Sequence, residues 1–207
     1  MIRASHLAIV VIVLILCAEI PAQTAAESSD EYSVYNAVIA HMFAGDKVTF
    51  DTQSKVKRVV IRDRTTTDYA WSEKGENWSQ VKIRLPKLAD DTITNYEANL
   101  KTSTELKPAF SFGLTYSIFS KKDYDTVFDA QGDFDRTSKN WESFYKKFPE
   151  SGGHISFSNI GLNKSGNQAL VYFVHWCGSL CGTGHYVLLM KNDNKWLVDS
   201  IGLMWIS

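Results

Sequence analysis

The chain has no excess of charge of either sign. Its 207 residues include 22 lysines and arginines against 23 aspartates and glutamates, which leaves a net charge of −1. The lysines are spread along the chain, so the sequence has neither the basic footprint of a nucleic-acid-binding protein nor a polybasic membrane patch. We therefore expect no nucleic-acid partner, and contact with a membrane only through the apolar segment at the N-terminus.

Long apolar runs are equally scarce, with one stretch of twelve residues from Leu7 to Ala18. Arg3 precedes this run, and small residues follow it up to Ala26, as in a secretory signal peptide. Spanning a bilayer takes about 20 apolar residues, so the alternative of an uncleaved inner-membrane tether fits the run less well. We expect residues 1–26 to be a signal peptide and the mature protein to be periplasmic or secreted.

Cysteine is rare as well. Of the three cysteines, one lies in the signal segment, and Cys177 and Cys181 stand together in residues 175–185, HWCGSLCGTGH. Because exported proteins meet an oxidising environment, a disulfide between these two is favoured. Two alternatives stay open: a zinc site formed with His175 and His185, or cysteines that pack as small apolar side chains. The ligand spacing matches no known zinc pattern, so we expect neither a metal nor a cofactor.

Apolar runs lie on both sides of this glycine-rich stretch, which predicts a β-hairpin with polar groups at its tip. A disulfide would make the tip rigid and display the two histidines at its base. We therefore expect a recognition loop and assign no catalytic residue. The predicted binding loop consists of His175, Gly178, Ser179, Gly182, Thr183, Gly184 and His185.

The mature chain, residues 27–207, has the length of one globular domain, and no linker interrupts it. Apolar residues at three- and four-residue intervals predict helices at 32–43, 76–85, 90–100 and 138–148, the third capped by Asp90 or Asp91. Ser120 and Asp123 resemble a capping box for a further short helix. Alternating or continuous apolar residues predict strands at 57–62, 112–118, 155–162, 169–176, 186–190 and 196–206.

The last three predicted strands form an antiparallel meander, because short polar segments connect them. In strand 169–176 the residues that point to either face of the sheet are apolar, which predicts a central strand covered on both faces. We expect an α+β fold in which helices pack on a curved antiparallel sheet that ends in this meander. This layout is similar to cystatin-like and NTF2-like cones, which host enzymes and binding proteins alike.

The pattern CGSLCGTGHYVLL at residues 177–189, together with the terminal WIS at 205–207, resembles an uncharacterised group of exported bacterial proteins. The resemblance covers mainly the last quarter of the chain. No activity is assigned to that group, so the resemblance implies export from a bacterial cell and no reaction.

These observations favour a non-catalytic binding or interaction module whose partner is a protein or small molecule of the cell envelope. The alternative is an envelope enzyme that uses His175, His185 or Asp199 in a pocket of the sheet. An enzyme should bring at least two of these side chains together in a concave site. Separately, the charged triplet RDR at 62–64 ends a predicted strand. A solvated charge run is the favoured interpretation, and internal pairing or an anion site are the alternatives.

Overall fold

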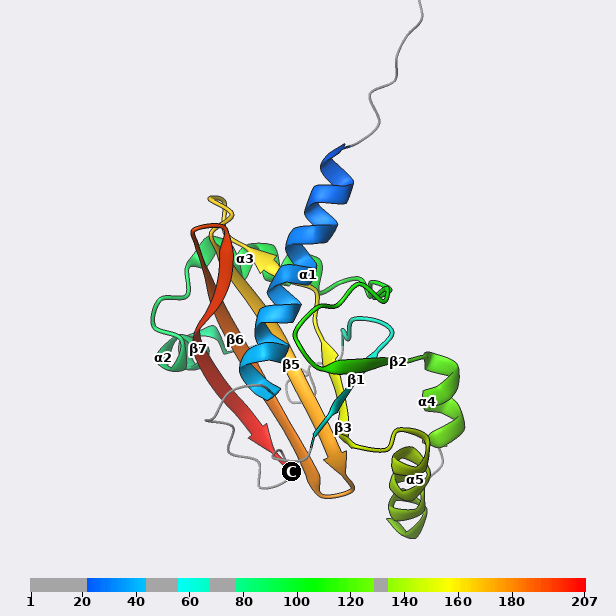
Figure 1. Ribbon diagram of the computed structural model, residues 1–207. Coiled ribbons are helices and arrows are strands. Elements are labelled where there is room, and N and C mark those ends of the chain that lie inside the picture. Colours follow the sequence, from blue (N-terminus) through cyan, green and yellow to red (C-terminus); the bar gives the residue numbers. More distant parts are fainter. Residues whose placement is uncertain (1–21, 44–55, 68–76, 129–133) are drawn as a thin grey trace, which may run out of the picture.

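The computed structural model describes residues 22–43, 56–67, 77–128 and 134–207. Within these ranges the chain has an α+β fold with five helices and seven strands (Figure 1). The helices are α1 (Ala22–Phe43), α2 (Trp78–Arg84), α3 (Asp90–Asn99), α4 (Lys121–Val127) and α5 (Phe134–Lys147). The strands are β1 (Arg58–Arg62), β2 (Thr115–Phe119), β3 (Ser151–Phe157), β4 (Gly161–Leu162), β5 (Gln168–Gly178), β6 (Cys181–Asn192) and β7 (Lys195–Ile206).

Most of the expected signal peptide lies outside the described residues. α1 begins at Ala22, ahead of the expected cleavage point after Ala26. No helix in the described ranges is long and apolar enough to cross a membrane.

All seven strands belong to one sheet, in the order β2-β1-β3-β5-β6-β7, with β4 beside β5. The predicted meander is confirmed, because β5, β6 and β7 pair antiparallel in sequence order. The prediction of a purely antiparallel sheet is wrong, since β1 pairs in parallel with both β2 and β3. The chain makes these parallel pairs possible by passing through α2 and α3, and then through α4 and α5, before it returns to the sheet.

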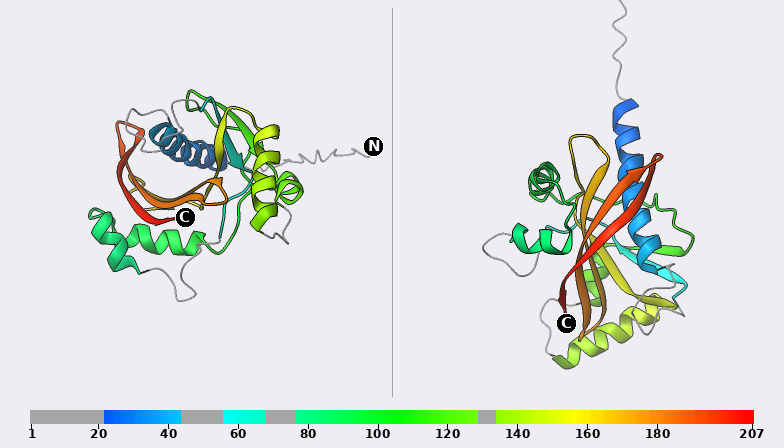
Figure 2. Two further views of the ribbon diagram at one scale, coloured as in Figure 1. Left: turned by 90° about the horizontal axis from the view of Figure 1, so that it is seen from below. Right: turned by 90° about the vertical axis from the view of Figure 1, so that its left-hand side faces the viewer.

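α1 lies on one face of the sheet, which curves around it (Figure 2). Its buried side chains follow the predicted three- and four-residue spacing and are Val34, Tyr35, Val38, Ile39 and Met42. They pack in one cluster with the residues of β5 that point to this face, Ala169, Val171 and Phe173. The predicted helix is thus confirmed, and it begins earlier than expected.

The opposite face of β5 is covered too, as predicted. Its alternate residues, such as Leu170 and Tyr172, pack in a second cluster with α2 and α3. On the same side of the sheet, α4 and α5 form a third cluster with Val60 of β1 and Phe119 of β2. Trp176 of β5 packs against the second and the third cluster. Two helix pairs therefore share the face that points away from α1 (Figure 2).

The capping residues in the sequence predicted the start of α4 correctly but not that of α3. The capping box is confirmed: Ser120 Oγ accepts a hydrogen bond of 3.0 Å from the Asp123 N–H and donates one of 2.8 Å to the Asp123 carboxylate. The expected cap of α3 is wrong, because Ala89 is the N-cap residue and makes no side-chain cap bond. Asp90 and Asp91 instead occupy the first turn, where a negative charge favours the helix dipole.

Two predicted strands differ from the observed ones. The segment 155–162 divides into β3 and β4, which pair with different parts of β5. The segment 112–118 is a strand only from Thr115, because the chain bends before that residue and Gly113 has a positive φ of 87°.

Candidate functional site

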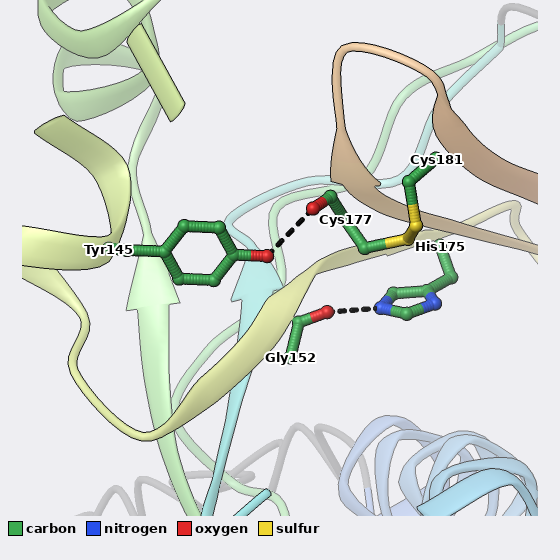
Figure 3. Close-up of a disulfide and its surroundings, with 5 residues drawn as sticks. All are labelled: Tyr145, Gly152, His175, Cys177 and Cys181. Atoms are coloured by element: carbon green, nitrogen blue, oxygen red, sulfur yellow. Dashed lines mark hydrogen bonds between the residues drawn. A yellow bond between two sulfur atoms is a disulfide. The ribbon is translucent and has the colours of Figure 1, made fainter. Parts of the chain in front are cut away.

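Cys177 and Cys181 form a disulfide at the end of the β5–β6 hairpin (Figure 3). Their Cα atoms lie 5.0 Å apart, a separation that a disulfide requires. Gly178 stands opposite Cys181, and the strand register shifts at Cys177, so β5 bulges where the bond forms. Both sulfur atoms are used in this bond, and the zinc arrangement considered from the sequence is therefore not formed.

Two hydrogen bonds attach this end of the hairpin to its neighbours (Figure 3). The Tyr145 hydroxyl on α5 donates to the Cys177 carbonyl at 2.8 Å, and His175 Nε2 lies 2.7 Å from the Gly152 carbonyl oxygen on β3. At Gly153, φ is 108° and a Cβ would lie 2.0 Å from the Trp176 carbonyl oxygen, so the close approach of β3 and β5 requires glycine there. The disulfide end is thus fixed to the sheet.

Much of the predicted recognition loop lies inside a strand. Only Ser179 and Leu180 form the turn, and residues 182–185 are buried in β6. His175 is 4% exposed and His185 is 8% exposed. The expectation that both histidines are displayed at the base of the tip is wrong, because the long hairpin continues through them and turns their side chains toward the α1 face.

Of the residues considered for an enzyme, His175 and His185 lie near enough for the charge of His175 to act on the pKa of His185, whereas Asp199 lies apart from them. His175 and His185 lie on the α1 face of β5 and β6, where Phe173 stands opposite His185. Asp199 forms an ion pair of 2.6 Å with Lys87 instead. Burial lowers the pKa of His175 and brings the pKa of His185 down to about 4. Both histidines are therefore neutral at pH 7.

A cavity of about 460 Å³ lies on the sheet face that points away from α1. Its volume falls in the range of small-molecule sites. We call it the Arg62–Trp205 cavity, and it is lined by Arg62, Arg64, Thr65, Thr66, Thr67, Ser103, Tyr124, His154, Ser156, Tyr172, Val174, Trp176 and Trp205. These residues come from four strands, one helix and two connecting segments, and none of them is acidic.

Arg62, at the end of β1, is the half-buried cation of this cavity. Its guanidinium carbon lies 3.8 Å from the centre of the Tyr124 ring, a cation–π contact. Its Nε is buried and has no hydrogen-bond partner among the described residues. Burial lowers the pKa of Arg62, and the negative charge of Asp63 acts in the opposite direction. The interpretation of this triplet as a solvated charge run is therefore wrong for Arg62.

The segment after β1 is held in place by Thr65, which is 1% exposed. Its hydroxyl donates to the Asn159 side chain at 2.8 Å and accepts from the Thr104 N–H at 2.7 Å. Its own N–H donates to the Thr104 carbonyl at 2.8 Å. The neighbouring Arg64, whose side chain is exposed, therefore lines the cavity from a fixed backbone.

His154 supplies a neutral polar group to the cavity. Its side chain is 4% exposed, and its ring stacks on Trp141 at a centroid distance of 5.7 Å. Burial, and then the positive charge of Arg62, lower the pKa of His154 to about 3. Its Nδ1 has no hydrogen-bond partner in the described ranges. His154 was not predicted as a site residue, although His154 and Ser156 alternate with apolar residues near the end of β3.

Aromatic side chains form another part of the lining. The rings of Trp176 and Trp205 lie 4.9 Å apart, and the Trp205 indole N–H donates a 2.7 Å hydrogen bond to the Tyr172 hydroxyl. A Cβ at Gly184 would lie 2.1 Å from Trp205 Nε1, and one at Gly182 would lie 2.5 Å from the Trp176 ring. These two glycines, predicted as loop residues, therefore make room for the tryptophans.

A larger cavity of about 930 Å³ lies between α1 and α3, but its carboxylates already have partners. Asp30 accepts hydrogen bonds of 2.9 Å from Lys191 and from the Trp196 indole. Asp91 accepts a hydrogen bond of 3.0 Å from the Lys164 N–H. The Arg62–Trp205 cavity is the stronger candidate, because the two arginines in its lining form no ion pair with a described residue and lie beside fixed aromatic rings.

The chain matches no protein-family model, no curated protein and no solved structure.

Proposed function

We propose that this protein is an exported, non-catalytic binding protein that holds a small molecule in the Arg62–Trp205 cavity. The observation that carries the proposal is the combination, in one cavity, of the Arg62 guanidinium, which forms no ion pair with a described residue, and an aromatic lining held by hydrogen bonding. A half-buried guanidinium favours a hydrogen-bond acceptor, so a ligand that accepts hydrogen bonds would complete the site.

The titratable groups of the cavity favour binding over acid–base catalysis. Among the residues that the structure describes, no aspartate, glutamate, cysteine or lysine lines it. His154 is the side chain there that would serve as a general base, but its pKa of about 3 is far from neutral pH. An efficient general base has a pKa near the working pH. The cavity therefore supports recognition, and we place the mature protein in the periplasm or outside the cell on the evidence of its N-terminal run and its cysteine pair.

A ligand screen on the mature protein, residues 27–207, tests the proposal. Compounds are ranked by the rise in melting temperature and by the change in tryptophan fluorescence, because Trp176 and Trp205 line the cavity. Ser156→Tyr places a large ring in the cavity and should abolish the response to any true ligand. Ser143→Tyr, on an exposed position of α5, is the matched control.

Circular dichroism confirms that both variants are folded. Hits that bind wild type and Ser143→Tyr but not Ser156→Tyr support the proposal. A screen without hits, or hits that bind all three proteins equally, would overturn it.

A further inference from the structure

The charges around the Arg62–Trp205 cavity are unbalanced. Arg62 and Arg64 line it, and none of the described lining residues is acidic. Asp63 lies between them in sequence and offsets one of the two positive charges, while its Oδ2 accepts a 2.8 Å hydrogen bond from the Lys121 N–H. Two arginines in the described lining favour a ligand with a negative group.

The acids of the adjacent helix α4 pair with lysines, and the charge of Asp125 makes only the smallest of the contributions to the pKa of Arg62. Asp125 pairs with Lys121 at 2.6 Å, and Asp123 pairs with Lys147 at 2.5 Å. No carboxylate in the described ranges forms an ion pair with Arg62.

The guanidinium of Arg62 lies among aromatic rings. Its carbon is 3.8 Å from the centre of the Tyr124 ring and 5.7 Å from that of Phe119, and Tyr124 also forms a hydrogen bond with it. Stacking on aromatic rings uses the face of a guanidinium and leaves its in-plane N–H groups to bind carboxylate or phosphate oxygens. The Arg62 and His154 side chains both line the cavity, while Arg62 Nε and His154 Nδ1 themselves are buried below its surface.

Aromatic side chains lie elsewhere along the same cavity. Trp205 is held by its hydrogen bond to Tyr172, and Trp176 packs against it. Fixed indole rings favour flat aromatic groups, which stack on them or approach them edge to face. The volume of about 460 Å³ restricts the occupant to a small molecule.

We infer that the ligand is a small aromatic anion whose carboxylate or phosphate group faces Arg62 and Arg64 and whose ring lies against Trp176 and Trp205. This inference rests on the proposed function, because it names the ligand class of the same cavity. His154 then contributes a neutral hydrogen bond, and Ser156 is a half-buried neighbour on the same strand.

Isothermal titration of the mature protein with matched probes tests the charge of the ligand. Indole-3-acetate is compared with its neutral amide, indole-3-acetamide, and with the cation tryptamine. Phenyl phosphate distinguishes a preference for phosphate from one for carboxylate. At least one of the two anions should bind roughly tenfold or more tightly than the neutral and cationic probes, since a charge-assisted hydrogen bond is worth about that factor. Added salt should weaken the binding.

Three variants locate the contact. Arg62→Gln and Arg64→Gln should each weaken anion binding roughly tenfold. Arg58→Gln is the matched control, because Arg58 lies on the same strand but does not line the cavity. Arg64 is exposed, so its replacement tests the anion contact even if Arg62→Gln disturbs folding.

The outcomes separate this inference from the proposed function. Equal affinity for indole-3-acetate and indole-3-acetamide, or an anion affinity unchanged in Arg64→Gln, overturns the assignment of an anion. Hits from the screen that are all neutral or cationic overturn it as well, while the cavity remains a binding site. A screen without any hit blocked by Ser156→Tyr overturns both.

Discussion

The indole N–H of Trp205, near the end of β7, donates a 2.7 Å hydrogen bond to the hydroxyl of Tyr172 on β5. The strand between them is β6, and the two side chains meet over Gly184. A Cβ at that position would lie 2.1 Å from Trp205 Nε1 and 2.4 Å from the Tyr172 hydroxyl. Three strands of the meander therefore fix part of the cavity lining because the middle one has no side chain there.

Gly184→Ala should lower the free energy of unfolding by about 1–3 kcal/mol, the usual cost of overpacking a buried site. Urea denaturation of the mature protein measures it. In a Trp205→Ala background, one of the two close contacts is gone, so the same substitution should cost less. Equal costs in both backgrounds would show that the contact with Trp205 is not the cause.

Replacement of Cys177 and Cys181 together by serine should lower the stability by about 2 kcal/mol, the entropy of closing a short loop. Thermal unfolding with and without reductant checks this value. Reductant should destabilise wild type by a similar amount and leave the double variant unchanged. Two thiols that are freely alkylated in the unreduced exported protein, as seen by mass spectrometry, would contradict the disulfide.

Acid should destabilise the protein through its buried histidines. The pKa of His154 falls from an ordinary 6.5 to about 3, and that of His185 falls to about 4. Below pH 6.5 the unfolded chain binds protons on these rings while the folded chain does not, so stability is full above that pH and declines toward pH 4. Each histidine should cost about 2 kcal/mol at pH 5.

Urea midpoints measured from pH 7.5 to pH 4.5 check this decline. His185→Gln removes one of the buried rings whose pKa is lowered and should make the decline shallower. A stability that stays constant between pH 7 and pH 5 would be incompatible with neutral buried histidines.

Ser120→Ala should cost about 1 kcal/mol, because the first N–H groups of α4 lose their cap. Thr126→Ala, at an exposed position of the same helix, should change the stability by less than about 0.5 kcal/mol. The two variants are compared by chemical denaturation. A loss that is no larger at Ser120 than at Thr126 would argue against the cap as a source of stability.

Export predicts the N-terminus of the mature protein. Edman sequencing of protein isolated from the cell envelope should begin near Glu27, because a signal peptidase cuts after small residues. Full-length chain that starts at Met1 in the cytoplasm would refute export.

The sequence by itself determined the features that depend on neighbouring residues. The buried apolar face of α1 follows from apolar residues at three- and four-residue intervals. The start of α4 follows from Ser120 and Asp123, which stand three residues apart. The meander follows from apolar runs joined by short polar turns. The proximity of Cys177 and Cys181 follows from their place at one hairpin end. In each case the interacting groups lie within a few residues or one turn of the chain, so a local pattern contains the information.

Tertiary structure alone decided the cavity and the mixed sheet. Arg62, Tyr124, His154 and Trp205 stand far apart in sequence and meet only because β1 pairs with β3 and the meander folds beside them. Parallel pairing leaves no turn motif, since its strands are joined by distant crossovers. The same holds for the histidines of the hairpin: whether a side chain is displayed or buried depends on what packs over its strand, and that packing comes from elements elsewhere in the chain.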